Sequence, residues 1–229
     1  MPEVTTRTRQ LLLRKLRDDM PESGIVLRLM MACNDASLTN QALENAKAVG
    51  HGYTDSKTAR AAAMYFVRMQ LSHLFEGLKV LDDISDNPRL AALINRCDAQ
   101  TQVSFDDLKP YRSGGSDRAR FEQIVGRIRH GLSFHYDQNG KSLAKSLNRK
   151  CEVDSTATSS VTRGNHAYKW RFSVADDLIE DIVVVDLWGA GDVLADKESA
   201  DLVSDEINAI FLAFVDFAGE FIWRYCKSL

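Results

Sequence analysis

Proline is nearly absent from this chain of 229 residues, where it occurs only at positions 2, 21, 88 and 110. Because proline removes a backbone donor and clashes with the preceding helical turn, the long stretches between these positions are free to be helical. Apolar residues recur in them at spacings of three and four, the period of a helix that buries one face. The sequence therefore predicts a mainly α-helical protein whose helices meet along apolar stripes.

Apolar stripes and the breaks between them predict the bounds of the helices. Pro21 ends one helix and begins the next, and the polar residues Ser37 and Thr39 interrupt or bend that second helix. A glycine-containing break at 50–52 precedes a long apolar stripe. The expected helices span about residues 5–19, 22–46, 55–84, 88–97, 117–136, 141–150, 176–188 and 199–225.

A small β-hairpin is expected among these helices. Tyr168, Trp170, Phe172 and Val174 alternate with polar or small residues, which is typical of a short strand. Gly164 and Asn165 form a turn signal before it. A weak partner strand precedes that turn, at residues 159–162.

The chain is expected to form one domain. A serine- and threonine-rich stretch at 151–165 could mark a joint between subdomains, but the pieces beside it are too short to hold cores of their own. We therefore predict a single domain over residues 1–229. Its core lies at about 55–137, and a C-terminal hairpin and helices follow at 151–229.

Charge and cysteine content narrow the class of protein. The net charge is −3, so a nucleic acid would have to be met by a local basic patch rather than by a general positive field. The four cysteines form no Cys-x-x-Cys pair, which argues against a zinc knuckle and a disulfide framework. The first residues lack an apolar signal core, and no apolar run reaches membrane-spanning length. We expect a cytoplasmic protein without membrane association or cofactor.

The stretch from Arg129 to Asp137 carries the residues best suited to chemistry. It reads Arg-His-Gly-Leu-Ser-Phe-His-Tyr-Asp and ends an otherwise apolar-striped helix. An arginine guanidinium binds two oxygens of a phosphate at once, and a histidine imidazole exchanges a proton near neutral pH. Cleavage of a phosphodiester requires both groups, so this stretch is the first candidate for an active site.

The helical period decides how these side chains are placed. The apolar stripe that starts at Phe121 continues in steps of three and four to His135, which places this histidine on the core face. Arg129 lies on the flank of the stripe, about 120° of rotation from His135. A distorted helix end, or the same helix of a second subunit, can close that gap. Because histidines at the edge of a core helix are more often packing residues than catalysts, both roles stay open.

Arg129 and His135, with His130 directly after the arginine, resemble the R-x(4–6)-H motif of the HEPN superfamily. The neighbouring residues are similar to the motif helix of HEPN proteins of the abortive-infection type. The helix predicted at about 55–84 resembles the partner helix of the same group, and the resemblance covers roughly residues 55–137. Three polar residues of the partner helix carry this likeness: Arg68, His73 and Glu76.

The resemblance implies a HEPN-like helical bundle with extra helices, usually dimeric, in which the motif helices face each other. Many members are metal-independent endoribonucleases of toxin–antitoxin, abortive-infection or CRISPR systems. Carried over to this chain, Arg129 holds the scissile phosphate, His135 acts as acid or base at the 2′-hydroxyl or leaving oxygen, and His130 orients the phosphate. The residues expected to support them are Tyr136, Asp137, Arg68, His73 and Glu76.

Two functions follow from these observations. The first is a metal-independent endoribonuclease of a defence or toxin–antitoxin type that cleaves RNA at a homodimer interface, with an antitoxin protein as a further partner. The alternative is a non-catalytic HEPN-like interaction module in which Arg129 and His135 are structural. His73 and Glu76 lie close on one helical face, but a metal site would need further ligands, and no metal is expected.

An RNA substrate requires a basic surface near the motif. Four basic residues follow the motif within a short predicted helix. They suit a phosphate-binding patch and an ordinary solvated helix face equally well. These residues are Lys141, Lys145, Arg149 and Lys150.

Overall fold

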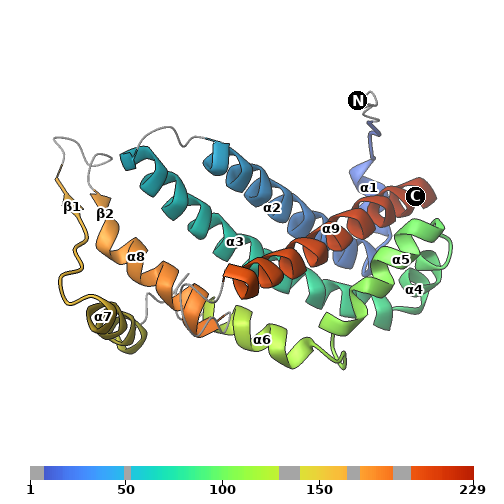
Figure 1. Ribbon diagram of the computed structural model, residues 1–229. Helices are drawn as coiled ribbons and strands as arrows, with labels where there is room; N and C mark the ends of the chain where they lie inside the picture. The colour runs from blue at the N-terminus through green and yellow to red at the C-terminus, as the bar shows by residue number, and fades with distance from the viewer. Residues whose placement is uncertain (1–7, 49–52, 129–139, 164–170, 188–196) are drawn as a thin grey trace.

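Three long helices organise the fold. The computed structural model describes residues 8–48, 53–128, 140–163, 171–187 and 197–229. Helices α2 (Glu22–Ala48) and α3 (Tyr53–Asp86) pack side by side, and α9 (Lys197–Ser228) lies against both (Figure 1). The expected mainly α-helical bundle is therefore confirmed. Within the described stretches, no helix is both long enough and apolar enough to cross a membrane.

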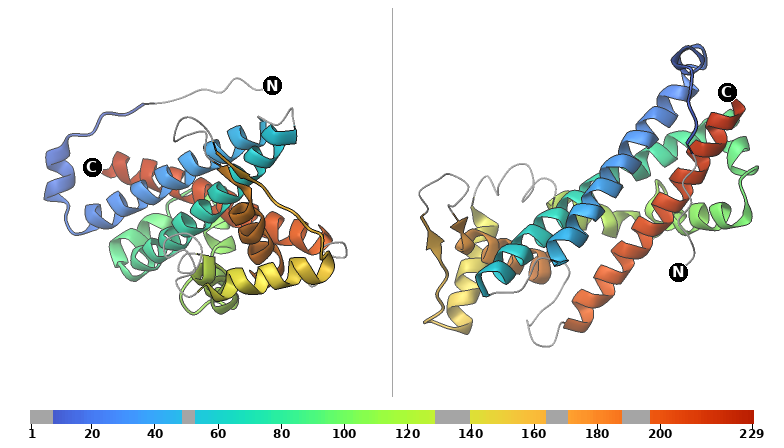
Figure 2. Two further views of the ribbon diagram at one scale, coloured as in Figure 1. Left: turned by 90° about the vertical axis from the view of Figure 1, so that its left-hand side faces the viewer. Right: turned by 90° about the horizontal axis from the view of Figure 1, so that it is seen from above.

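Shorter elements cover the two ends of this bundle. Figure 2 shows α4 and α5 beside the C-terminal half of α9, and α7, α8 and the two strands at the opposite end. A turn of 3-10 helix at Lys109–Tyr111 connects α5 to α6, and a π-helical turn at Ile182–Leu187 continues α8. These shorter elements are α1 (Leu13–Asp18), α4 (Pro88–Ile94), α5 (Ala99–Asp107), α6 (Arg118–Arg127), α7 (Lys141–Val153), β1 (Val161–Thr162), β2 (Arg171–Phe172) and α8 (Ser173–Asp181).

The hydrophobic core lies where α9 meets α3, α2 and α5. The apolar stripe predicted for the last helix is confirmed, because its aromatic residues are buried along its length. Phe105 of α5 packs on Phe217 with ring centres 4.7 Å apart, and Phe217 stacks on Phe221 at 5.3 Å. Phe214 is fully buried and contacts α3 where Gly77 leaves room for its ring.

The predicted hairpin is present. Strands β1 and β2 pair antiparallel, with Val161 opposite Phe172 and Thr162 opposite Arg171. Helix α8 then begins at Ser173, three residues before the expected start at Asp176. Val174, the last residue of the alternation that predicted the strand, therefore belongs to α8 instead.

Two further details of the helices differ from expectation. The first helix begins at Leu13 rather than at about residue 5, since residues 8–12 are not helical. Helix α2 continues without a break to Ala48. Thr39 is accommodated inside it, because its Oγ1 donates a 2.6 Å hydrogen bond to the carbonyl oxygen of Asp35, one turn earlier.

Helix α5 was not anticipated, and residues 88–97 form a shorter helix than predicted. Asn87 caps α4, with Pro88 at the first helical position, and that helix ends at Ile94. Asp98 then caps α5 by accepting hydrogen bonds from the backbone nitrogen and hydroxyl of Thr101. These bonds lower the pKa of Asp98, so its carboxylate stays ionised at the positive end of the helix.

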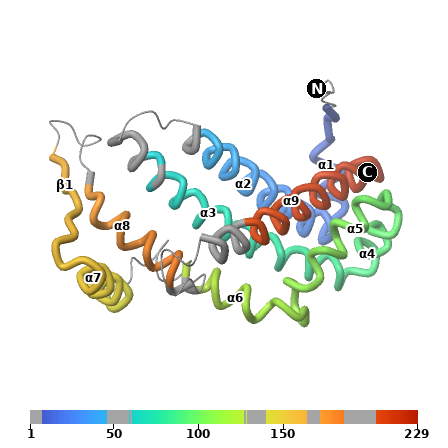
Figure 3. The backbone as a smooth tube through the Cα atoms, viewed as in Figure 1, coloured from blue at the N-terminus to red at the C-terminus, as the bar shows by residue number. Residues whose placement is uncertain are grey.

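The two ends of the described chain lie together. Figure 3 shows α1 beside the C-terminal end of α9. The Lys15 ammonium donates a hydrogen bond to the carbonyl oxygen of Leu229. Tyr225 donates a 2.5 Å hydrogen bond to Asp19, which also forms a 2.6 Å ion pair with Arg89 at the start of α4. Asp19 thus links the beginning of the bundle to α9 and α4.

Tyr111 forms a second polar link to α9. Its hydroxyl donates a 3.0 Å hydrogen bond to Glu206 Oε1, and Arg120 of α6 forms an ion pair with the same carboxylate. Burial and the bond to Glu206 raise the pKa of Tyr111 to about 12. The neutral phenol is therefore the form that the folded state stabilises.

We expect Tyr111→Phe to lower the free energy of unfolding by about 1 kcal/mol at neutral pH, the net value of one hydrogen bond. Because folding raises this pKa, the stability it contributes is fully present below about pH 10 and is lost as the pH rises through about 12. Urea unfolding at neutral and alkaline pH should show the variant and parent stabilities converging. Tyr65→Phe, at an exposed position, is the control. A stability difference between Tyr111→Phe and the parent that does not change with pH would contradict the prediction.

Candidate functional site

The helix that leads into the Arg129–Asp137 stretch is fixed on α3 by its apolar face. Phe121, Val125 and Ile128 are buried, as the predicted stripe requires. The ring of Phe121 lies 6.4 Å from that of Phe75 on α3 and 5.7 Å from that of Tyr111. Phe121 therefore holds α6 against α3, and Ile128, the residue that directly precedes Arg129, is buried in the core.

Arg118 strengthens this contact from the side. Its guanidinium lies 4.8 Å from the centre of the Phe75 ring and forms a 2.7 Å ion pair with Glu122 one turn further along α6. The Lys79 ammonium lies 4.5 Å from the same ring centre. Two cations thus lie close to the Phe75 ring, and each is also paired with a carboxylate of its own helix, Glu122 and Glu76.

The proposed catalytic residues themselves lie outside the residues that the structure describes. The same holds for three of the supporting residues. These positions are Arg129, His130, His135, Tyr136 and Asp137. Their roles stay predictions from the sequence.

Arg68, a further supporting residue, faces α8. It lines a cavity of about 50 Å³ together with Asp176, Asp177 and Glu180 of that helix. Its guanidinium also lies 5.7 Å from the centre of the Tyr65 ring on α3. The attraction between the guanidinium and these carboxylates favours the packing of α8 on α3.

The other two polar residues of α3 face different neighbours. His73 Nδ1 lies 3.7 Å from Asp35 Oδ2 on α2, and the His73 side chain is 32% exposed. Glu76 accepts a 3.0 Å hydrogen bond from Lys79 on the same helix. The described contacts therefore direct His73 towards α2, whereas Arg68 faces α8, so these two residues do not form a single cluster.

No group of three or more metal-binding side chains is close enough to hold an ion within the described part of the chain. The four cysteines are all free thiols, as the sequence suggested. Burial raises the pKa of Cys97 and of Cys226, so these two thiols stay neutral and packed. Cys151, in contrast, is exposed on α7.

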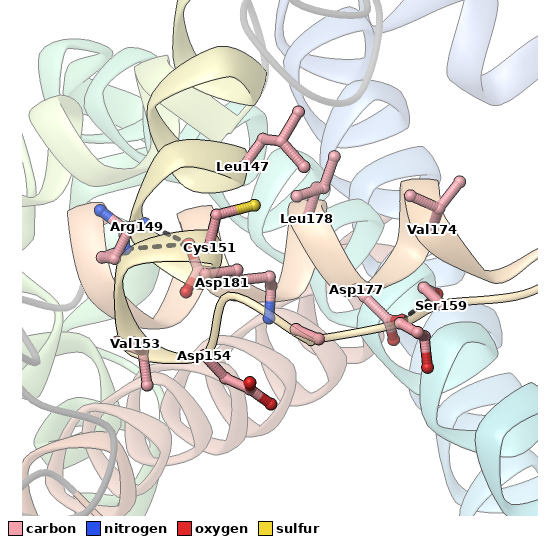
Figure 4. Close-up of a pocket in the computed structure, with 13 residues that line it drawn as sticks. Leu147, Arg149, Cys151, Val153, Asp154, Ser159, Val174, Asp177, Leu178 and Asp181 are labelled. Carbon is pink, nitrogen blue, oxygen red and sulfur yellow. Dashed lines mark hydrogen bonds and ion pairs between the residues drawn. The ribbon is translucent and has the colours of Figure 1, made fainter.

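A groove lies between α7 and α8. It has a volume of about 540 Å³, and its walls are mainly apolar (Figure 4). Figure 4 shows Leu147, Leu178 and Val174 on one side of the groove, and Val153 and Asp154 on the other. The sequence did not predict this groove, because it forms where the chain between α7 and β1 folds back over α8.

A buried ion pair at this groove joins α7 to α8. Asp181 is 5% exposed and accepts hydrogen bonds from both Arg149 and Ser146, the latter at 2.7 Å. The sequence groups Arg149 with three lysines, in a phosphate-binding patch or a solvated helix face. Arg149 belongs to neither, because its guanidinium binds Asp181. The signal for this pair was an aspartate three residues after Leu178, on the apolar face of α8.

Comparison with known proteins gives no family assignment. No family model matches the chain, and no characterised protein or solved structure matches it significantly.

Proposed function

We propose that this protein is a metal-independent endoribonuclease of a defence or toxin–antitoxin type, in which Arg129 and His135 are the catalytic residues. The observation that supports this most directly is the docking of α6 on α3. Ile128, the residue directly before the motif, is fully buried in the core. The Arg-x5-His motif therefore follows a residue anchored in the core, which suits side chains that must be held in fixed geometry.

Basic side chains lie near this contact. They are Arg118, Lys79 and Arg120, and each is paired with a carboxylate, from Glu122, Glu76 and Glu206 respectively. Basic side chains around a motif helix raise the local concentration of a polyanion such as RNA, but these paired carboxylates reduce the attraction. The patch on α7 contributes less than its sequence suggests, because Arg149 binds Asp181.

The chemistry proposed for the motif is internal transesterification. The 2′-hydroxyl of RNA attacks the adjacent phosphorus, its proton passes to a base, and the bond from phosphorus to the 5′-oxygen breaks as that oxygen receives a proton. The products are a 2′,3′-cyclic phosphate and a 5′-hydroxyl. His135 exchanges one of these protons, and Arg129 stabilises the extra negative charge on the non-bridging phosphate oxygens in the transition state. His130, Tyr136 or the motif of a second subunit supplies the other proton-transfer group.

The alternative function is a non-catalytic helical interaction module. The contacts of α3 favour it, since Arg68 supports α8 and His73 faces Asp35 on α2. In that case Arg129 and His135 would support the packing of neighbouring helices, as Arg68 and His73 do. The two functions make opposite predictions for the stability of variants at these positions.

We expect His135→Ala to reduce RNA cleavage in EDTA at least about 100-fold, the lower range for loss of a general acid–base group. His166→Ala, a histidine outside the motif, is the matched control and should keep parental activity. The assay should release a 2′,3′-cyclic phosphate, and 2′-deoxy substrates should stay intact. Equal cleavage by parent and His135→Ala, or none by either, would exclude the nuclease.

Melting temperatures separate the two functions. A catalytic arginine can be removed without loss of fold, so Arg129→Ala should abolish cleavage while the melting temperature stays near that of the parent. An arginine that is needed for packing cannot be removed without loss of stability. A large fall in melting temperature for Arg129→Ala would therefore support the interaction module.

A further inference from the structure

Helix α2 is apolar on two opposite faces. Val26, Leu29 and Ala36 are buried against the rest of the bundle. About 180° away around the helix, three large apolar side chains are exposed: Leu27 at 40%, Met31 at 65% and Leu38 at 64%. A helix at the surface of a monomer ordinarily has one apolar stripe. The second stripe of α2 therefore indicates a surface that binds a partner.

The spacing of the exposed stripe is that of a helix pair. Leu27, Met31, Asn34 and Leu38 follow one another at steps of four, three and four, which is the a/d repeat of two helices packed side by side. Asn34 is exposed and is the polar member of this series. A single asparagine in such a seam selects register and partner number at some cost in stability. We call Leu27, Met31, Asn34 and Leu38 the α2 stripe.

Opposite charges flank the α2 stripe on one side. Arg28 and Asp35 are seven residues apart, next to the stripe, and their side chains are 55% and 51% exposed. When two copies of α2 run antiparallel about a twofold axis between Met31 and Asn34, Leu27 lies opposite Leu38 of the partner subunit. The same register places Arg28 beside Asp35 of the partner subunit, and this ion pair occurs twice.

From this complementarity we propose that the α2 stripe binds the α2 stripe of a second copy of the chain in antiparallel orientation. The contact is small, so the association is weak and depends on protein concentration. It goes beyond the proposed nuclease, because α2 and α6 lie on opposite sides of α3 (Figure 1). A pairing through α2 thus leaves the motif helix available for other contacts.

The first experiment measures mass by analytical ultracentrifugation from about 1 to about 200 µM, the range in which weak dimers dissociate. We expect the parent mass to double over this range and Leu38→Asp to prevent the increase. Leu212→Asp is the matched control, since Leu212 is 51% exposed on α9, and it should behave like the parent. A parent mass that does not change with concentration, or a Leu38→Asp variant that still associates, overturns the proposal.

Charge exchange tests the orientation. Arg28→Asp and Asp35→Arg should each weaken association about tenfold, and the double variant should restore it, because both intersubunit pairs are then reversed. Within one copy, Arg28 contacts Asp83 at 2.7 Å and Asp35 contacts His73. The double exchange repairs neither contact, so restored association can only arise between copies. A double variant weaker than both single variants overturns the antiparallel register.

Cross-linking gives an independent readout of the same register. In a background with Cys151→Ser, a Leu27→Cys protein mixed with a Leu38→Cys protein should form a disulfide-linked heterodimer under mild oxidation. Leu27→Cys alone should not, because in the antiparallel pair its two copies are about 16 Å apart along the helices. Efficient linkage of Leu27→Cys to itself would show parallel helices instead. This result does not depend on RNA cleavage. Failure of the α2 pairing can therefore be told apart from failure of the proposed nuclease.

Discussion

Replacing Gly77 with alanine is expected to lower the free energy of unfolding by about 2–3 kcal/mol, the cost of overpacking a well-filled core. A methyl group on Gly77 would lie 2.5 Å from Cζ and 2.6 Å from Cε2 of Phe214. The Phe214 ring is fully buried and cannot move into solvent. Either the ring leaves its preferred rotamer or α3 and α9 move apart, and both reduce packing.

The sign of this effect is informative because alanine ordinarily stabilises a helix relative to glycine by about 1 kcal/mol. Gly219→Ala is the matched control. Gly219 lies on the exposed side of α9, and a methyl group there would meet nothing within 4 Å. We expect this control to raise stability and Gly77→Ala to lower it in the same urea titration. Two variants of equal stability would contradict the close approach of α9 to α3.

A double-mutant cycle identifies the ring that is responsible. Phe214→Leu removes the atoms nearest to Gly77 and is destabilising by itself, because it leaves a gap in the core. In the presence of Gly77→Ala that gap accommodates the new methyl group. The double variant should be more stable than the sum of the single effects predicts, by about 1 kcal/mol or more. If the effects of the two single variants simply add, the Phe214 ring is not what the new methyl group contacts.

The helical fold could be predicted largely from the period of apolar residues. The stripe from Ile207 to Phe221 and the stripe from Phe121 to Ile128 are buried as expected. Errors arose where one local signal competed with another. Thr39 signalled a break but donates its hydroxyl hydrogen bond inside α2, and Asp98 is a helix cap that separates α4 from an unexpected α5.

The candidate site was harder to predict, because a sequence period places residues on a helix but not against a particular neighbour. His73 and Glu76 share one side of α3, yet their described partners are Asp35 on α2 and Lys79 on α3 itself. Arg149 illustrates the same limit. Its basic neighbours suggested a nucleic-acid surface, whereas its partner Asp181 comes from a helix 32 residues further along the chain.

The ion pair between Arg149 and Asp181 is the basis of the second large predicted effect on stability. We expect Asp181→Ala to lower the free energy of unfolding of the α7–α8 region by about 3 kcal/mol, since Arg149 then loses the buried carboxylate that accepts its hydrogen bonds. The Ser146 hydroxyl is fully buried and bonds Asp181 at 2.7 Å, so it loses this acceptor as well. Hydrogen exchange should show faster exchange of the α7 amides in this variant.

Two variants establish that the effect comes from the buried pair. Asp177→Ala removes a neighbouring acid of α8 that accepts a hydrogen bond from exposed Ser159, and it should cost less than about 1 kcal/mol. Arg149→Met combined with Asp181→Leu replaces both charges by apolar groups of similar size. This double variant should recover most of the lost protection, because neither charge is then buried alone. If Asp181→Ala and Asp177→Ala had equal effects, the ion pair would not be what holds α7 on α8.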